Sequence, residues 1–255
     1  MSLHGPVSRP PKSLERNILE FAELAFPGGG FFVEAGGHDG LKYSNTLALD
    51  ATKWSGLMIE PSPVSFPLLR KNRPEVLAAN VALVGSPDIK FIHGTFHSGS
   101  PLASAHPGLM SRDSRAFAGQ GIFRRIVQKF AKILRLSVPV PLTQVPATTL
   151  TQLLADMKVS AIDLFILDVE GLELSVLEGF TFSLKPRVFV IETRTADAMK
   201  ISNIMLKNGF VLAANFSNFD PESHPNWSGD HQDFVWIRNS EDQLLSDARN
   251  LKLFQ

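Results

Sequence analysis

The sequence predicts a doubly wound α/β fold, in which a mostly parallel sheet is covered by helices on both faces. Short apolar runs alternate with helical patterns along most of the chain, as in successive βαβ units. Four of the runs end in a carboxylate, at Glu34, Glu60, Asp168 and Glu192. Because the carboxyl ends of parallel strands meet at one edge of such a sheet, we expect these four acids to gather there.

The first part of the chain predicts three helical segments and four strands. An amphipathic helix follows Ser13, which suits a helix cap, and it ends at Pro27 and the glycines behind it. A helix, or a loop and a helix, is expected over 41–51, and a further helix from Ser62, although Pro67 disfavours a regular first turn there. Apolar runs predict strands over 31–34, 56–60, 76–84 and 89–92.

A region without this rhythm, 94–147, interrupts the alternation. It is rich in Ser, Pro, Gly and His, and a long insert of this kind in a compact domain is typically functional. Within it, residues 122–135 form a helical pattern with one apolar face and one basic face. We expect this helix on the protein surface, with an anionic substrate or a lipid surface as alternative contacts.

The alternation resumes after the insert. A further element is expected over 148–154, and helices are predicted over 172–178, 196–207 and 242–251. Strands are predicted over 162–168, 188–192, 210–214 and 234–237, with a polar loop over 221–227 before the last of them. We therefore predict one domain over 13–255, with the 94–147 insert as a lid that shapes the substrate pocket, and a flexible lead-in over 1–12.

Composition excludes several classes of protein. The 255 residues include 25 basic and 25 acidic side chains, so no net charge favours nucleic acid or a membrane surface. Without Cys, the chain has no disulfide scaffold, thiolate metal site or cysteine nucleophile. No apolar run is long enough to span a membrane, and the first residues lack the apolar core of a signal peptide. A cytoplasmic protein is expected.

The loop after the first strand, Gly-Gly-His-Asp-Gly over 36–40, has the character of a ligand-binding loop. Its glycines would allow the backbone to approach a ligand closely. Glu60 follows Glu34 by 26 residues, the spacing at which an acid binds ribose hydroxyls in dinucleotide proteins. The loop is not G-x-G-x-x-G, however, and the acidic Asp39 disfavours a pyrophosphate. A cofactor with a ribose, no phosphate and a positive end fits better, as in S-adenosylmethionine.

A set of motifs extends this interpretation to most of the chain. The segments are Phe32-Val33-Glu34-Ala35-Gly36-Gly37-His38-Asp39-Gly40, Tyr43-Ser44-Asn45-Thr46, Gly56-Leu57-Met58-Ile59-Glu60-Pro61, Asn80-Val81-Ala82-Leu83, Asp163-Leu164-Phe165-Ile166-Leu167-Asp168-Val169-Glu170-Gly171-Leu172-Glu173, Pro186-Arg187-Val188-Phe189-Val190-Ile191-Glu192 and Asp233-Phe234-Val235-Trp236. In order and spacing they resemble the FkbM family of S-adenosylmethionine-dependent methyltransferases. The resemblance covers about 31 to 93 and 148 to 238. It implies a class I methyltransferase (Rossmann-like) fold, with a seven-stranded sheet whose last strand is antiparallel.

The resemblance also implies a cofactor site. Glu60 would hold the ribose hydroxyls, Asn80 and Val81 would border the adenine, and Asp168 would lie beside the methionine ammonium or the methyl path. His38 stands where the family often has Asn. The implied cofactor-binding residues are Glu34, Gly36, Gly37, His38, Asp39, Gly40, Asn45, Thr46, Glu60, Pro61, Asn80, Val81 and Asp168.

The segment from Asp168 to Glu173 is the candidate for catalysis. Asp168 or Glu170 would serve as a general base if burial raises its pKa. Alternatively, Glu170 and Glu173 merely favour the start of the following helix, where acids suit the helix dipole. Asp168 and Glu192 also resemble the ligands of metal-dependent methyltransferases such as catechol O-methyltransferase, and would suit Mg²⁺. Without a third identified ligand, a divalent metal is not favoured.

The histidines give a weaker signal. His93, His97 and His106 lack the close spacing of metal ligands on one helix. We expect them to be solvated loop residues, with a role for His97 or His106 as a base as the alternative.

The predicted activity is S-adenosylmethionine-dependent methyl transfer to a hydroxyl group of a small molecule or sugar. N-methylation is left open by the residues. A non-catalytic binding module of the same fold and a dinucleotide-dependent oxidoreductase are the alternative functions, and titration with the respective cofactors separates them.

Overall fold

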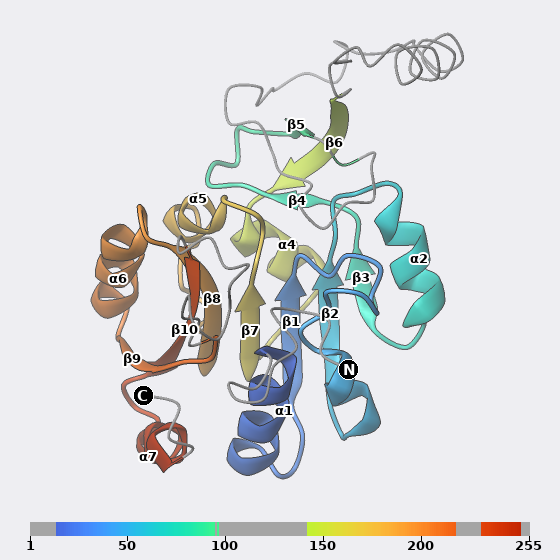
Figure 1. Cartoon of the computed structure of the whole chain (residues 1–255). Helices are drawn as coiled ribbons and strands as arrows, with labels where there is room; N and C mark the ends of the chain where they lie inside the picture. The colour runs from blue at the N-terminus through green and yellow to red at the C-terminus, as the bar shows by residue number, and fades with distance from the viewer. Residues whose placement is uncertain (1–13, 95, 97–141, 218–230, 251–255) are drawn as a thin grey trace, which may run out of the picture.

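Within the residues that the computed structural model describes, which are 14–94, 96, 142–217 and 231–250, the centre is a seven-stranded sheet (Figure 1). Its strands are β1 (Phe31–Ala35), β2 (Ser55–Ile59), β3 (Leu77–Ala79), β7 (Leu164–Leu167), β8 (Val188–Arg194), β9 (Phe210–Asn215) and β10 (His231–Arg238). The order is β3-β2-β1-β7-β8-β10-β9. β10 is antiparallel to both neighbours, while the other pairs are parallel. The predicted sheet, with its antiparallel last strand, is confirmed.

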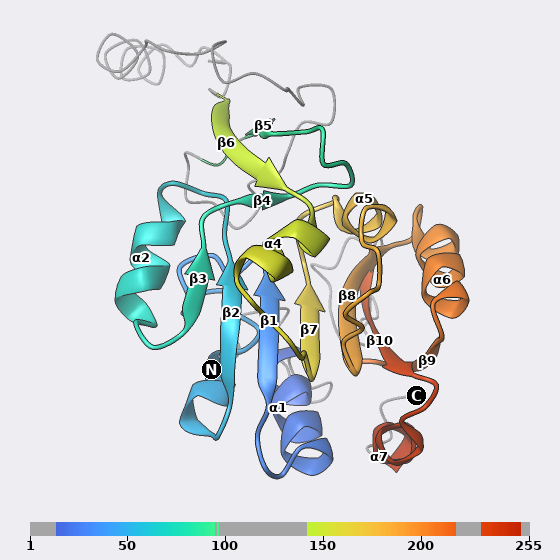
Figure 2. The ribbon, with the colours of Figure 1, turned by 180° about the vertical axis from the view of Figure 1, so that it is seen from behind.

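Helices cover both faces of this sheet (Figures 1 and 2). Phe32 and Val33 are adjacent in β1 but belong to different cores, because successive strand side chains point to opposite faces. The core with Phe32 includes residues of α1 (Leu14–Ala25), the 3₁₀ helix η1 (Leu47–Ala51), α2 (Ser65–Asn72) and α7 (Asp242–Asn250). The core with Val33 includes residues of α4 (Leu150–Asp156), α5 (Glu173–Glu178) and α6 (Ala198–Lys207).

A second, smaller sheet lies beyond the carboxyl ends of the central strands (Figure 1). It consists of β4 (Ala82–Leu83), β6 (Thr143–Thr148) and β5 (Phe91–Gly94), in the order β4-β6-β5. β4 is parallel to β6, and β5 is antiparallel to it. Val84, directly after β4, and Ile92 of β5 are buried and pack in one cluster with Leu172, which comes just before α5. The small sheet is therefore anchored at the edge where the strand-end acids lie.

Two strand predictions were wrong in detail. The predicted strand over 76–84 is divided: β3 joins the central sheet, whereas β4 joins the small sheet after an interruption at Asn80 and Val81. β6 lies inside the region predicted to be an insert without strands. Pro146 concealed it, because Pro lacks the N–H that a ladder needs.

Two further local predictions need correction. The helix expected from Ser62 begins at Ser65, and Pro67 is then in its first turn, where no intrahelical N–H is required. Ser62 Oγ instead accepts hydrogen bonds from Val64 N and Ser65 N, at 3.2 and 3.1 Å. His93 is not a solvated loop residue, because it is buried in β5.

Several predictions fall outside the described residues. They are the lead-in over 1–12, the basic helix over 122–135, the polar loop over 221–227, and His97 and His106. Among the residues that are described, no helix has both the length and the apolar character that crossing a membrane requires.

Candidate active site

The loop after β1 approaches both neighbouring strands closely. The amides of Gly36 and Gly37 donate to the Ile59 carbonyl oxygen, at 2.9 and 3.2 Å. Gly36 has a φ of +98°, and a Cβ atom there would lie 1.8 Å from the backbone oxygen of Asp168. A side chain is excluded by both the conformation and the contact. Gly36 thus allows the ends of β1 and β7 to come together.

Glu60, at the end of β2, holds the same loop. His38 N donates to its Oε2 at 2.9 Å, and Ser62 N donates to its Oε1 at 2.7 Å. Asn80 Nδ2 donates to the Glu60 backbone oxygen at 2.7 Å. Burial raises the pKa of Glu60 to about 7, against the opposing effect of the two amide hydrogen bonds. Because a carboxylate oxygen can accept more than one hydrogen bond, Glu60 retains the capacity to accept from a ligand diol.

Asp39 and Gly40 shape the turn that follows. Asp39 Oδ1 accepts hydrogen bonds from Leu41 N and Lys42 N, at 3.0 and 2.6 Å. Gly40 and His38 both have left-handed backbone conformations, with φ of +78° and 48°. The Asp39 carboxylate is thus used by the turn itself.

Glu34 is enclosed by the chain, with 1% of its surface exposed. Its carboxylate accepts hydrogen bonds from Ser44 Oγ at 3.0 Å, from Asn45 N at 2.6 Å and from Thr46 Oγ1. Arg73 Nη1 lies 3.8 Å from Glu34 Oε2. Burial raises the pKa of Glu34, while Arg73 and the hydrogen bonds oppose this rise. Glu34 therefore fixes the 44–46 loop.

Arg73 is a residue of this region that the sequence did not reveal. It comes directly after α2, and its Nη1 donates to Ser44 Oγ and Thr46 Oγ1 at 3.1 and 2.9 Å. It also forms an ion pair with Asp50, and its guanidinium carbon lies 5.4 Å from the centre of the Phe32 ring. All these contacts are distant in sequence, so no local pattern marks the residue.

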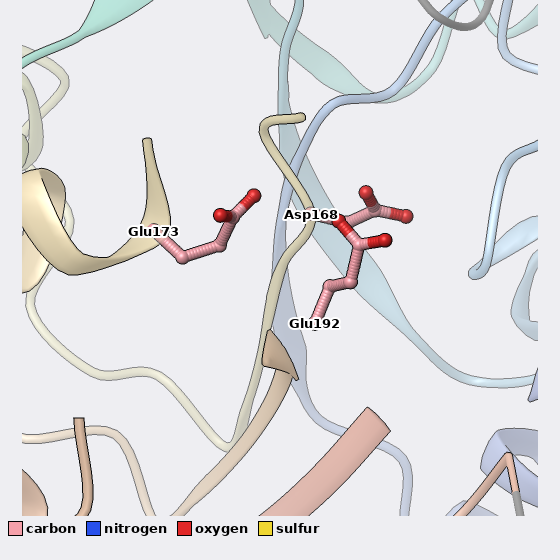
Figure 3. A group of neighbouring side chains, drawn as sticks. All are labelled: Asp168, Glu173 and Glu192. Carbon is pink, nitrogen blue, oxygen red and sulfur yellow. The ribbon is translucent and has the colours of Figure 1, made fainter. Parts of the chain in front are cut away.

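Three carboxylates form an acidic cluster at the ends of β7 and β8, namely Asp168, Glu173 and Glu192 (Figure 3). One oxygen atom from each lies within 4.8 Å of those of the other two. Glu173 points from the first residue of α5 toward the other pair. Burial and then the Glu192 charge raise the pKa of Asp168 well above its ordinary value. Burial, followed by the charges of Glu173 and Asp233, raises the pKa of Glu192 to about 8.

Glu173 also determines the shape of the loop before α5. Its Oε1 accepts hydrogen bonds from Val169 N at 2.8 Å and Gly171 N at 3.1 Å. Glu170 and Gly171 between them have left-handed conformations, with φ of 56° and 98°. Glu173 does begin the helix, as the alternative interpretation expected, but it also orients the loop that carries Glu170.

Glu170 is partly buried beside the acidic cluster. Burial and the charge of Glu173 raise its pKa, while the positive charges of Arg194 and His231 oppose this rise. Glu170 is therefore, besides Asp168, another carboxylate that a ligand at this edge of the sheet could contact.

Most of the predicted site residues come together at the ends of β1, β2 and β7. Asn45 connects the 44–46 loop to the acidic cluster, because its Nδ2 donates to Asp168 Oδ2 at 3.4 Å. Pro61 and Val81 are partly exposed beside the Glu60 backbone and Asn80. Glu34 and Thr46 lie instead inside the protein, at a buried network behind this edge.

A mostly parallel seven-stranded sheet with one antiparallel strand, and a glycine loop beside strand-end acids, define the class I methyltransferase (Rossmann-like) fold. The family described as "Methyltransferase FkbM domain" matches residues 34–212, well over half of the chain. The chain belongs to this family of S-adenosylmethionine-dependent methyltransferases. No curated protein matches the sequence significantly.

Solved structures with a similar arrangement are distant in sequence. The ribosomal protein L11 methylase of Lactobacillus delbrueckii subsp. bulgaricus is 11% identical, with a TM-score of 0.45 over 88% of this chain and 77% of that one. A TehB-like SAM-dependent methyltransferase of Corynebacterium glutamicum ATCC 13032 is 12% identical, with a TM-score of 0.40 over 88% and 86%. The precorrin-6y C5,15-methyltransferase of Geobacter metallireducens GS-15 is 11% identical, with a TM-score of 0.40 over 92% and 93%. Likenesses at this level do not bear on the substrate.

Proposed function

We propose that this protein transfers the methyl group of S-adenosylmethionine to a hydroxyl group of a small molecule or sugar. The observation that carries the proposal is Glu60, a buried carboxylate that the amides of His38 and Ser62 hold at the end of β2. In this orientation it would accept hydrogen bonds from the ribose hydroxyls. The family match to the FkbM domain supports the same donor.

The chemistry of the surrounding groups fits this cofactor. Acceptor groups dominate the edge, with Glu60 at one end and Asp168 at the other, and they suit the hydroxyls and the positive end of the cofactor. Asp39 next to the glycine loop would repel a pyrophosphate, which the dinucleotide alternative requires. Asn80 and Val81, which follow β3, would border the adenine.

One of two carboxylates would act as the base on the acceptor. When bound, S-adenosylmethionine supplies a methyl group whose bond to the sulfonium sulfur breaks as the acceptor oxygen attacks. The hydroxyl proton would then pass to a carboxylate oxygen, and Asp168 or Glu170, which follow β7, would offer one. Fixed positions for donor and acceptor would contribute much of the acceleration, since the methyl group is already activated. The 94–147 insert would shape the acceptor pocket as a lid.

Calorimetry with S-adenosylmethionine tests the donor assignment. We expect saturable binding of one cofactor per chain, and S-adenosylhomocysteine release in a screen of hydroxylated small molecules and sugars. Absence of heat at high protein concentration would overturn the proposal. Binding without turnover on any acceptor would favour the non-catalytic module, and saturable NAD(P) binding in a fluorescence titration would favour the oxidoreductase.

Replacement of Glu60 by Ala should weaken cofactor binding by roughly 1–3 kcal/mol, because hydrogen bonds to the ribose and to the glycine loop are both lost. The affinity is measured by calorimetry. Glu75→Ala is the matched control, since Glu75 is an exposed acid shortly after α2 and should bind as the unchanged protein does. An unaltered affinity in Glu60→Ala would show that the ribose lies elsewhere.

The affinity for S-adenosylmethionine should rise severalfold between about pH 6 and about pH 8. Glu60, whose pKa is raised to about 7, changes over this interval from mainly protonated to mainly ionised. A hydroxyl donates a stronger hydrogen bond to an ionised carboxylate than to a neutral carboxyl group, so binding strengthens as the proton leaves. Calorimetry across this pH range measures the effect, and the Glu60→Ala variant should show a much flatter dependence. A decrease in affinity over the same range would contradict the proposed contact.

A further inference from the structure

We propose that the acidic cluster, together with Asn45, binds one divalent metal ion that holds the oxygen atom of the methyl acceptor. The ion site itself stands on the geometry of the described residues. Its role toward the acceptor rests on the proposed function of methyl transfer.

The spacing of the cluster suits one cation. Asp168, Glu173 and Glu192 each offer an oxygen atom, and these atoms lie within 4.8 Å of one another. Oxygen ligands lie about 2.0–2.6 Å from Mg²⁺ or Ca²⁺, so atoms on opposite sides of one ion are roughly 4–5 Å apart. The three carboxylates are supplied by the residue after β7, by α5 and by β8, and Figure 3 shows Glu173 approaching the other two from the opposite side.

Asn45 supplies an independent indication of a ligand. Its side chain is buried, with 1% of the residue exposed, and its Nδ2 contacts Asp168 Oδ2 at 3.4 Å. The amide group of Asn45 therefore lies against Asp168, with its nitrogen facing the carboxylate. Its Oδ1 atom has no hydrogen-bond partner among the described residues, and neither does Glu192 Oε2. Since a buried polar atom without a partner is costly, a cation or its bound water at this point would satisfy both oxygen atoms.

The charge around the cluster favours a cation. Glu170 and Asp233 add negative charge next to it. Arg194 supplies positive charge, and His231 Nε2 lies 4.0 Å from Glu192 Oε1. Among the described residues at and beside the cluster, the carboxylates outnumber these two basic side chains. A divalent ion would compensate the excess, as buried carboxylates otherwise repel one another.

The cluster is also preorganised. The amides of Val169 and Gly171 hold the Glu173 carboxylate in one orientation. Contacts of this kind behind a ligand are typical of metal sites, where they fix the direction of the ligand oxygen. With three carboxylates and one amide oxygen as ligands, a six-coordinate ion has positions left for an acceptor oxygen. Binding there lowers the pKa of a hydroxyl, which favours a hydroxyl acceptor.

Titration of the whole chain with Mn²⁺ alone, without S-adenosylmethionine, tests the site. Mn²⁺ prefers oxygen ligands as Mg²⁺ does, and its free form is measured by electron paramagnetic resonance. We expect one ion per chain, with at least about tenfold weaker binding in Glu192→Gln. This variant is chosen because Glu192 Oε2 has no hydrogen-bond partner among the described residues. Glu178→Gln alters an exposed acid of α5 and should bind Mn²⁺ as the unchanged protein does.

Failure of Mn²⁺ to bind the unchanged protein would overturn the inference, and so would equal affinity in Glu192→Gln. Asp168→Asn is the second variant, in case Glu192→Gln does not fold, and circular dichroism verifies the fold of both. S-adenosylmethionine is titrated separately into the same samples. Cofactor binding without Mn²⁺ binding would refute the metal site alone, whereas Mn²⁺ binding without cofactor binding would refute the proposed function.

Discussion

Replacement of Asp168 by Asn should lower turnover by roughly 10²- to 10⁴-fold. The side chain lies at the end of β7, where it accepts a hydrogen bond from Asn45 of the 44–46 loop and belongs to the acidic cluster. Asp168 would either take the proton of the acceptor hydroxyl or bind a cation. An amide is a much weaker base and a much weaker metal ligand than a carboxylate. The rate is measured as S-adenosylhomocysteine release, with the acceptor that a screen identifies as fastest.

The same replacement should leave the fold intact. Burial and the charges of neighbouring acids raise the pKa of Asp168, so its ionised form is disfavoured in the folded protein. Removal of this charge relieves repulsion within the cluster, and the melting temperature should stay the same or rise. Asp156→Asn, at an exposed acid of α4, is the matched control and should retain full turnover. A folded Asp168→Asn variant with normal turnover would remove Asp168 from the chemistry.

The central sheet was predictable because local patterns and long-range packing agree in it. β1, β2, β7 and β8 are apolar runs buried on both faces, and each contains or leads into an acid near its carboxyl end. The small sheet was not predictable in the same way. β6 contains Pro146 and β4 has two residues, so neither has the pattern of an ordinary strand. Their pairing depends on contacts between segments far apart in the chain.

The candidate site shows a similar division. Glu60 and Asp168 follow strands, and their position at the sheet edge follows from topology. The sequence also suggested that Glu34 belongs at this edge, but its side chain points to the face where Arg73 and the 44–46 loop enclose it. The sequence explains Glu173 as an acid at the start of a helix, and gives no sign that it also belongs to the acidic cluster. The positions of both side chains depend on the direction in which they point and on partners from other elements, which the local sequence does not reveal.

The glycine loop shows most clearly how the role expected from the sequence differs from the role seen in the structure. The pattern over 36–40 suggested that glycine lets the backbone approach a cofactor. Gly36 has a further reason in the chain itself, because its α-carbon faces the Asp168 carbonyl oxygen of the neighbouring strand end. The glycine loop, which would contact the donor, thus packs directly against the backbone of Asp168, which would act on the acceptor. Gly36 makes this close packing possible.

Replacement of Gly36 by Ala should therefore destabilise the protein by roughly 3 kcal/mol or more. The new methyl group would lie 1.8 Å from a backbone oxygen, and the φ of +98° is unfavourable for any side chain. Because both atoms belong to backbone, the overlap is relieved only if the ends of β1 and β7 move apart. We also expect much weaker S-adenosylmethionine binding, since this movement displaces His38 from Glu60.

Gly28→Ala is the matched control for this substitution. Gly28 lies in the turn before β1, and an added Cβ atom there would meet nothing within 4 Å. Its unfolding free energy should stay within about 0.5 kcal/mol of the unchanged protein. Urea unfolding measures the stability of both variants, and calorimetry measures their cofactor affinity. If Gly36→Ala matched Gly28→Ala in both measurements, the two strand ends would not depend on this contact, and the coupling between the donor loop and Asp168 would be refuted.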